Sequence, residues 1–220
     1  MTSRKDAMPA ISQETDDGRL FSPSTERNRD VVRDVFLGEV AANARVLELA
    51  SGSGQHCVHI LKSAPKMTWI ASDISNASLR SAAAWVKFEG VETQVEAVRE
   101  LDASAQDWAI EGELDAILSC NMIHISPWNV GLGLFAGAGR YLAPKGKLVL
   151  YGPFKRNGEH TAQSNFDFDV SLKSRDASWG IRDLEEDVIP AAMQAGLTLS
   201  SIHAMPANNF SVVFERALTS

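Results

Sequence analysis

Apolar residues along the chain form short runs that alternate with segments of helical spacing. The short runs are bounded by turn residues and predict β-strands. They lie at residues 45–49, 67–71, 95–98, 114–121, 147–151, 197–204 and 209–215. Segments with apolar residues three or four positions apart predict helices. They lie at residues 28–37, 55–63, 76–89, 130–142 and 183–195, with a short one at residues 106–110.

The order of these elements predicts the fold class. Strands that alternate with helices form a doubly wound, mostly parallel α/β sheet, here with seven strands. Only residues 205–208 join the last two strands, so they should form an antiparallel C-terminal hairpin. Residues 155–180 carry few periodic signals, and a loop of that length usually has a function or acts as a lid. In such sheets the ligand binds beyond the carboxyl ends of the strands.

Composition narrows the class of protein. The 220 residues are 45% hydrophobic, which suits a single domain over residues 18–220 after a flexible polar tail, residues 1–17. The net charge of −7 argues against nucleic acid as a partner. Cys57 and Cys120 are isolated, which argues against disulfides and a zinc site and favours a cytoplasmic location. No apolar run is long enough to span a membrane.

A glycine-containing turn follows the first predicted strand. Glycines there let the backbone approach a ligand closely, and the N–H groups of the next helix face it. No lysine follows Gly54, so the turn is not a phosphate loop, and Cys57 stands where a dinucleotide-binding pattern has its third glycine. The turn instead resembles motif I of class I S-adenosylmethionine methyltransferases. The residues assigned to cofactor binding here are Glu48, Ala50, Ser51, Gly52, Ser53 and Gly54, with Ala50 in place of the usual first glycine.

Carboxylates follow the next two strands. Asp73 lies at a distance from the turn that suits a ribose-binding carboxylate, and Ile74 is assigned to the cofactor beside it. The alternative for Asp73 is an ordinary helix N-cap. Asp102 follows the third strand, where a methyltransferase contacts the adenine amino group with help from the N–H of Ala103. The alternative for Asp102 is a solvated turn residue.

The fourth strand ends at Asn121, close to His124. Asn121 could hold the ammonium group of the cofactor through its side-chain carbonyl. His124 could take a proton from an attacking nucleophile, because the pKa of histidine is near neutrality. A packing or hydrogen-bonding role is the alternative for His124. His56 and His59 lack a third ligand nearby in sequence, so a packing or surface role is favoured over metal binding.

Several motifs together resemble the methyltransferase-like protein 26 family, formerly a domain of unknown function. They are Phe21-Ser22-Pro23, Glu26-Arg27-Asn28, the turn from Glu48 to His56, Ser72-Asp73, Asn121 to Trp128, Tyr151 to Phe154, Ser164-Asn165, Phe168-Asp169, Trp179 to Glu185 and Met205 to Asn209. The resemblance runs from about residue 17 to residue 215. It implies a class I methyltransferase fold with S-adenosylmethionine as the cofactor, and it names no substrate.

Three further assignments follow from that resemblance. Arg27 could bind the carboxylate of the cofactor through both arms of its guanidinium, with an ordinary surface ion pair as the alternative. Tyr151 is a candidate wall or base residue, and it joins His124 as a candidate catalytic residue. Residues 155–180, with Trp179 and Arg182, would cover the pocket for the methyl acceptor.

The sequence therefore predicts an enzyme that transfers a methyl group from S-adenosylmethionine to a small molecule. Such a displacement needs alignment and exclusion of water and does not need a metal. One alternative is a protein that binds S-adenosylmethionine or a partner without turnover. Another is a nicotinamide-dependent oxidoreductase, which the missing third glycine disfavours.

Overall fold

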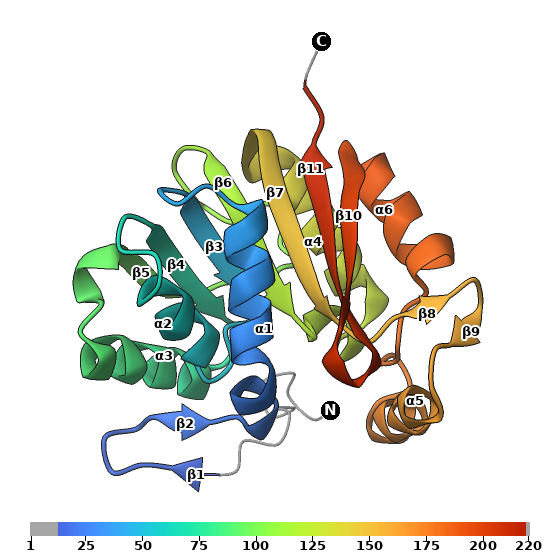
Figure 1. Ribbon diagram of the computed structural model, residues 1–220, viewed down its shortest axis with the longest axis horizontal. Helices are drawn as coiled ribbons and strands as arrows, with labels where there is room; N and C mark the ends of the chain where they lie inside the picture. The colour runs from blue at the N-terminus through green and yellow to red at the C-terminus, as the bar shows by residue number, and fades with distance from the viewer. Residues whose placement is uncertain (1–12, 219–220) are drawn as a thin grey trace. The chain divides into compact units, whose positions relative to one another are not determined.

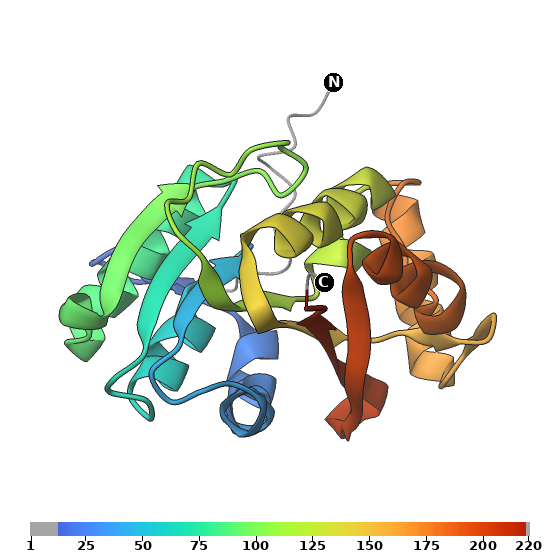
Figure 2. The same cartoon turned by 90° about the horizontal axis from the view of Figure 1, so that it is seen from above.

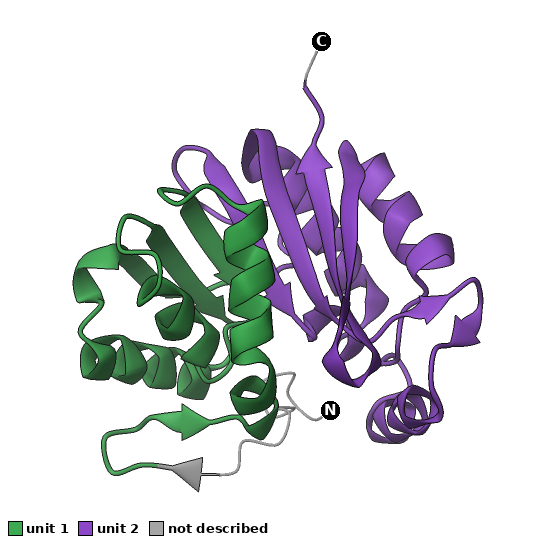
Figure 3. Cartoon of the chain, in the orientation of Figure 1, with its two compact units in different colours: residues 1–102 green, residues 103–220 purple. Residues whose placement is uncertain are grey.

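The computed structural model describes residues 13–218, and the chain divides into two compact units, Met1–Asp102 and Ala103–Ser220 (Figure 3). Most of the predicted tail, residues 1–12, lies outside the described residues. Residues 13–17 begin a small hairpin in which β1 pairs with β2. Within the described range, no helix has both the length and the apolar character needed to cross a membrane.

Unit 1 contains three parallel strands in the order β3-β4-β5 (Figure 1). Its elements are β1 (Gln13–Glu14), β2 (Leu20–Phe21), α1 (Pro23–Glu39), β3 (Arg45–Leu49), α2 (Gln55–Leu61), β4 (Thr68–Asp73), α3 (Asn76–Glu89), the 3-10 turn η2 (Glu92–Gln94) and β5 (Val95–Glu100). Figure 2 shows α1, α2 and α3 on the same face of these strands. Trp69 of β4 is fully buried and packs edge-on against Phe36 of α1.

Helix α1 begins five residues before the predicted start at residue 28, so that boundary was wrong. Its N-cap is Ser22, whose hydroxyl accepts a hydrogen bond from the N–H of Thr25, and Pro23 occupies the first turn, where no N–H is needed. The buried residues of α1 have helical spacing, but the first two are polar. They are Thr25, Asn28, Val32 and Phe36. Apolar periodicity therefore could not reveal the first turns.

Four strands of unit 2 pair in the order β10-β11-β7-β6, and two short strands, β8 and β9, pair with each other. Its elements are β6 (Leu114–Cys120), η3 (Met122–His124), α4 (Trp128–Tyr141), β7 (Leu142–Gly152), β8 (Lys155–Arg156), β9 (Glu159–His160), α5 (Gln163–Arg175), the π-helical turn η4 (Leu184–Val188), α6 (Ile189–Gln194), β10 (Leu197–Met205), η5 (Pro206–Asn208) and β11 (Asn209–Arg216). Strands β6 and β7 are parallel, whereas β11 is antiparallel to both β7 and β10. The predicted antiparallel C-terminal hairpin is therefore confirmed.

Residues 155–180 form secondary structure instead of the predicted loop. A small β8–β9 hairpin precedes α5, whose buried residues are Asn165, Asp169 and Leu172. Their spacing is helical, but two of the three are polar. The apolar residues Phe166 and Phe168 of this helix are instead substantially exposed. Because polarity and burial disagree in α5, the hydrophobic pattern did not predict it.

Two other predicted helices differ from the structure. Residues 106–110 are irregular, because the buried indole of Trp108 packs directly against Gly137 of α4 and donates a hydrogen bond to the carbonyl of Ala103. The predicted helix at residues 183–195 begins as a π-helical turn and continues as α6. Asp183 caps it by accepting hydrogen bonds from the N–H groups of Glu185 and Glu186.

Candidate functional site

The turn between β3 and α2 holds three residues in the left-handed region of backbone space. Their φ angles are 59° at Ala50, 58° at Gly52 and 85° at Gly54. A side chain at Gly54 would place its Cβ 2.5 Å from the Cα of Ala82, so this glycine lets α2 and α3 approach. A Cβ at Gly52 would have no atom within 4 Å. The space next to Gly52 is therefore not filled by other residues of the chain.

Asp73, at the end of β4, is held directly against this turn. One carboxylate oxygen accepts a hydrogen bond from the N–H of Gly52 at 3.0 Å, and the other accepts one from the N–H of Ser75 at 2.9 Å. Burial raises the pKa of Asp73, and the main-chain N–H donors act in the opposite direction. The N-cap of α3 is Ser75, not Asp73. The N–H of Ile74 and the side chain of Ser78 also donate to Asp73.

Serine side chains fix the path of the turn. The N–H of Ser51 donates to the carbonyl of Ser72 at 2.9 Å, and the N–H of Ser72 donates to the hydroxyl of Ser51 at 3.1 Å. The hydroxyl of Ser72 donates to the carbonyl of Glu48 at 2.7 Å, and Ser81 of α3 donates to the carbonyl of Ser53 at 2.7 Å. These contacts continue the β3–β4 pairing into the turn and hold its backbone in one conformation.

Glu48 is a buried acid within β3. Only 2% of it is exposed, and its carboxylate accepts a hydrogen bond from the indole N–H of Trp69 at 3.3 Å. Burial, with a smaller contribution from the nearby charge of Asp73, raises the pKa of Glu48 to about 7, although bonds to Ser51 and Trp69 oppose the shift. Its predicted contact with a cofactor stays a prediction.

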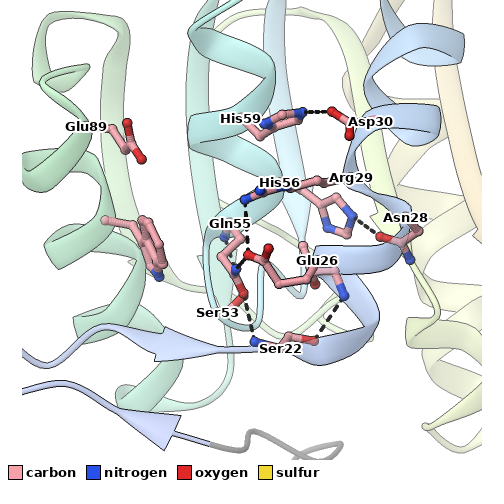
Figure 4. Close-up of polar contacts among 12 residues, drawn as sticks. Ser22, Glu26, Asn28, Arg29, Asp30, Ser53, Gln55, His56, His59 and Glu89 are labelled. Carbon is pink, nitrogen blue, oxygen red and sulfur yellow. Dashed lines mark hydrogen bonds and ion pairs between the residues drawn. The ribbon is translucent and has the colours of Figure 1, made fainter.

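The start of α1 is attached to the same turn. The side-chain oxygen of Gln55 accepts hydrogen bonds from the N–H of Ser22 and the hydroxyl of Ser53, each at 2.8 Å, and its amide nitrogen donates to Glu26 (Figure 4). Arg27 lies in this first part of α1 and is exposed. Its predicted contact with a cofactor carboxylate stays a prediction.

The two histidines of α2 contact α1. His56 pairs with the side-chain oxygen of Asn28 at 2.9 Å, and His59 pairs with Asp30 at 2.8 Å (Figure 4). Burial lowers the pKa of His56 to about 4. Among the described residues, no group of three potential ligands could hold a metal ion.

A hollow of about 290 Å³ lies between α1, α2 and α3. It is lined by Arg29, Gln55, Val58, His59, Lys62, Trp85 and Glu89. Its charged groups are paired, Arg29 with Glu26 at 3.1 Å and Lys62 with Glu89 at 2.5 Å. These pairs satisfy the charges that line the hollow.

Two further predicted cofactor residues, Asp102 and Ala103, are neighbours in the sequence where unit 1 ends. Asp102 is the last residue of unit 1, and the N–H of the preceding Leu101 donates to the carbonyl of Asp73 at 3.1 Å. Ala103 is the first residue of unit 2, and its carbonyl accepts the indole N–H of Trp108. Ile74 follows Asp73 directly in unit 1. Their contacts with adenosine stay predictions.

In unit 2, Asn121 directly follows β6. It adopts a left-handed φ of 61°, and its N–H donates to the carbonyl of Tyr151 in β7 at 2.7 Å. Tyr151 is 4% exposed. This hydrogen bond places the ends of β6 and β7 side by side, so the predicted residues Asn121, His124 and Tyr151 belong to one region of unit 2.

The imidazole of His124 is buried and has one hydrogen-bond partner. Its Nδ1 accepts the N–H of Arg182 at 3.3 Å, whereas its Nε2 has no partner within the described structure. Burial and the neighbouring charge of Arg182 lower the pKa of His124 to about 3. The ring also packs edge-on against Phe154, with centroids 4.9 Å apart. A neutral imidazole of such low pKa is a poor proton acceptor at neutral pH.

Arg182 connects the segment after α5 with the η3 turn. Its guanidinium donates to the carbonyl oxygens of Ile123 at 3.0 Å, Ser126 at 2.8 Å and Ser178 at 2.9 Å. Sequence reasoning did not predict the contacts with Ile123 and Ser126, because they join positions 59 and 56 residues apart. The only signal in the sequence that pointed to Arg182 was the motif from Trp179 to Glu185, which resembles the methyltransferase-like protein 26 family.

Asp169 of α5 is a second residue whose role was missed. It is 4% exposed and accepts hydrogen bonds from the N–H of Ile181 at 2.7 Å and from Lys173 at 2.6 Å. Burial alone would raise the pKa of Asp169, but these donors hold it below its usual value. Asp169 therefore fixes the backbone that presents Arg182 to His124.

Comparison with solved structures identifies the fold. An O-methyltransferase family protein from Burkholderia thailandensis matches 90% of this chain and 57% of its own chain, with a TM-score of 0.78 and 17% identity. An O-methyltransferase family 2 protein from Planctomyces limnophilus, solved in complex with apigenin, matches 88% and 60%, with a TM-score of 0.73 and 20% identity. Human N-acetylserotonin methyltransferase in complex with SAM matches 89% and 53%, with a TM-score of 0.72 and 12% identity.

These matches confirm the predicted fold class. It is α/β, with seven strands in a mixed sheet and antiparallel C-terminal strands, and it resembles class I methyltransferases. The chain spans slightly more than half the length of each of these proteins. A family model described as a protein of unknown function, DUF938, matches residues 19–216.

Proposed function

The chain belongs to the DUF938 family, and we propose that it is a methyltransferase that uses S-adenosylmethionine and acts on a small molecule. One observation carries this proposal. The turn after β3 leaves space beside Gly52, and the carboxylate of Asp73 is fixed next to it. Similarity of fold to proteins that bind this cofactor supports the same conclusion. The motifs shared with the methyltransferase-like protein 26 family agree with it.

The residues of unit 1 suit the adenosyl part of this cofactor. Main-chain N–H groups at Gly52 and Ser75 hold the Asp73 carboxylate in one orientation beside the turn. A carboxylate at the end of the second strand is the group that binds ribose hydroxyls in this class of sheet. The glycine at position 52 lets the ligand approach the backbone. The bound sulfonium supplies an electrophilic methyl group, and the chain supplies alignment and exclusion of water.

We further propose that the partner is a small molecule and not nucleic acid, because the net charge of −7 opposes binding to a phosphate backbone. Cys57 and Cys120 form no disulfide in the described structure, which fits a reducing compartment such as the cytoplasm. Asp102, Ala103, Asn121 and Arg27 remain candidate cofactor residues, and Tyr151 remains a candidate wall of the acceptor site.

Calorimetric titration with S-adenosylmethionine tests the cofactor site. Gly52 and Gly90 both have positive φ angles, and a Cβ at either position would have no atom within 4 Å. Valine should therefore strain both positions similarly, but only Gly52→Val places a side chain where the cofactor binds. We expect Gly52→Val to weaken binding by roughly 10- to 100-fold, and Gly90→Val to leave the affinity within about threefold of wild type.

Equal affinity in both variants would show that the cofactor does not bind at the turn. An absence of binding to the wild-type protein would refute the proposal itself. Turnover needs a second experiment. Incubation with methyl-labelled S-adenosylmethionine and fractionated small-molecule extracts should yield a labelled product. Saturable binding without any labelled product would favour the alternative, a protein that binds the cofactor without turnover.

A further inference from the structure

The tautomer of His124 follows from its contacts. Nδ1 accepts the main-chain N–H of Arg182, so that nitrogen must carry a lone pair and not a hydrogen. The ring of a neutral histidine then carries its hydrogen on Nε2. The N–H of Gly180 donates to the carbonyl of His124 at 2.9 Å, and Arg182 donates to the adjacent carbonyl of Ile123. The 180–182 segment thus fixes both the ring and its tautomer.

The Nε2–H of His124 is consequently a buried donor without a partner. His124 is only 1% exposed, and its Nε2 has no hydrogen-bond partner in the part of the chain that the structure describes. Buried N–H groups are nearly always paired, so an unpaired one calls for a ligand or a bound water. Nδ1 cannot release the Arg182 N–H without creating a second unpaired group.

Gly152 lies directly beside this donor. A Cβ there would be 2.8 Å from Nε2 of His124 and 3.0 Å from the side-chain oxygen of Asn121. The two side chains therefore flank the same glycine, and any larger residue would cover them.

We propose that His124 binds a small carboxylate through Nε2–H as a hydrogen-bond donor, and that it does not act as a general base. Of the two charges that act on the ring, the positive charge of Arg182 has the larger effect and the negative charge of Asp169 the smaller. Arg182 carries a positive charge and contacts main-chain carbonyls, while the carboxylate of Asp169 accepts hydrogen bonds from Lys173 and Ile181. A charge-assisted bond from Nε2–H to a carboxylate oxygen is stronger than a neutral one.

The proposal also restricts the methyl acceptor, and this part rests on the proposed function. If His124 cannot remove a proton, the acceptor must already carry its nucleophilic lone pair at neutral pH, as a carboxylate does. An oxygen of the carboxylate forms the new O–C bond while the S–C bond breaks, and that electron pair stays on sulfur. The product is a methyl ester, and no proton is transferred.

Nitrogen-15 NMR of the histidine-labelled protein tests the tautomer without any cofactor. The His124 signal can be assigned by its loss in His124→Gln. We expect the Nε2–H form, with no protonation as the pH is lowered from about 8 to 5. An Nδ1–H form, or ordinary protonation near pH 6.5, would overturn the donor role whether or not S-adenosylmethionine binds.

Titration with sodium acetate then tests the ligand class. Acetate should shift the Nε2–H resonance saturably, whereas acetamide and sodium chloride at equal concentrations should not. A resonance that ignores acetate and exchanges only with water would assign a buried water to Nε2 and refute the carboxylate. An equal response to acetate and acetamide would refute the preference for an anion.

Two amide variants separate the donor role from a structural role. His124→Gln places an amide nitrogen near the position of Nε2, whereas His124→Asn places one near Nδ1. For a donor role, the affinity for acetate should stay within about threefold of wild type in His124→Gln and fall about tenfold or more in His124→Asn. Equal losses in two variants that both keep the native amide spectrum would contradict the donor role.

Discussion

The turn after β3 in unit 1 and the His124 region in unit 2 are built in different ways. In the turn, the polar groups of neighbouring residues bond to one another, as Ser51 and Ser72 do, and Asp73 is held by main-chain N–H groups. The His124 region brings together the chain after β6, Gly152 and the segment before η4. There one buried nitrogen is left without a partner in the described structure.

The two regions would therefore recognise a ligand in different ways. The turn has a fixed backbone and leaves space at Gly52, so a ligand can bind there without a change in the conformation of the turn. The His124 region contains an unsatisfied donor, so a ligand there would complete the hydrogen bonding of the protein. Local substitutions in the turn should therefore act on stability and cofactor affinity, and substitutions around His124 should act on the position of one ring.

The largest effect is expected at Gly54. In Gly54→Ala the new Cβ would meet Ala82 at the α2–α3 contact while φ is 85°. Overpacking and left-handed strain together should lower the free energy of unfolding by about 4 kcal/mol. Gly90→Ala, which adds only strain, should cost about 1 kcal/mol in the same urea titration. Equal losses would mean that the turn is not fixed by close packing.

Glu48 gives a pH-dependent effect. Because its folded pKa of about 7 lies above the ordinary value of 4.5, the folded state binds more protons in between, and stability should fall as the pH rises from about 4.5 to 7. Glu48→Gln keeps an oxygen for Trp69 and removes the charge. The variant should match wild type near pH 4 and exceed it by about 3 kcal/mol above pH 8. If the free energy of unfolding of wild type and of Glu48→Gln changed with pH in the same way, the raised pKa of Glu48 would be contradicted.

A substitution of Arg182 tests whether its contacts hold the ring of His124 in place. Arg182→Met keeps much of the side-chain length but removes the donors to three carbonyl oxygens. We expect a loss of about 2 kcal/mol in the free energy of unfolding, together with a changed His124 NMR signal. Arg140→Met, at an exposed position of α4, should change stability by less than about 0.5 kcal/mol and leave that signal unchanged. An unaffected His124 signal in Arg182→Met would show that the ring is fixed by other contacts.

The same contrast explains what the sequence could predict. The strands, α3 with Gly90 as its left-handed cap, the antiparallel hairpin and the turn after β3 depend on contiguous residues, and the sequence indicated them. Helix α5 was missed because polar side chains such as Asn165 and Asp169 are buried while Phe166 and Phe168 are exposed. The contacts of Arg182 join distant segments, so no local pattern contains them.

The candidate site was predictable to a similar degree. The sequence indicated a glycine-containing turn after β3 and Asp73 at the end of the next strand, and the structure places these two, 21 residues apart, in one contact. The low pKa and the tautomer of His124 could not be predicted from local spacing, because burial and a main-chain donor 58 residues away determine them. The sequence left two roles open for His124, a base or a packing or hydrogen-bonding residue, and its contacts favour a hydrogen-bond donor.

The most direct test of the central claim is a crystal structure of the protein with S-adenosylmethionine bound. We predict that the adenosyl group lies beside Gly52, with both ribose hydroxyls within hydrogen-bond distance of the Asp73 carboxylate. The N–H groups of Gly52 and Ser75 should keep their bonds to that carboxylate. A cofactor bound elsewhere, with no ligand at Asp73, would contradict the account.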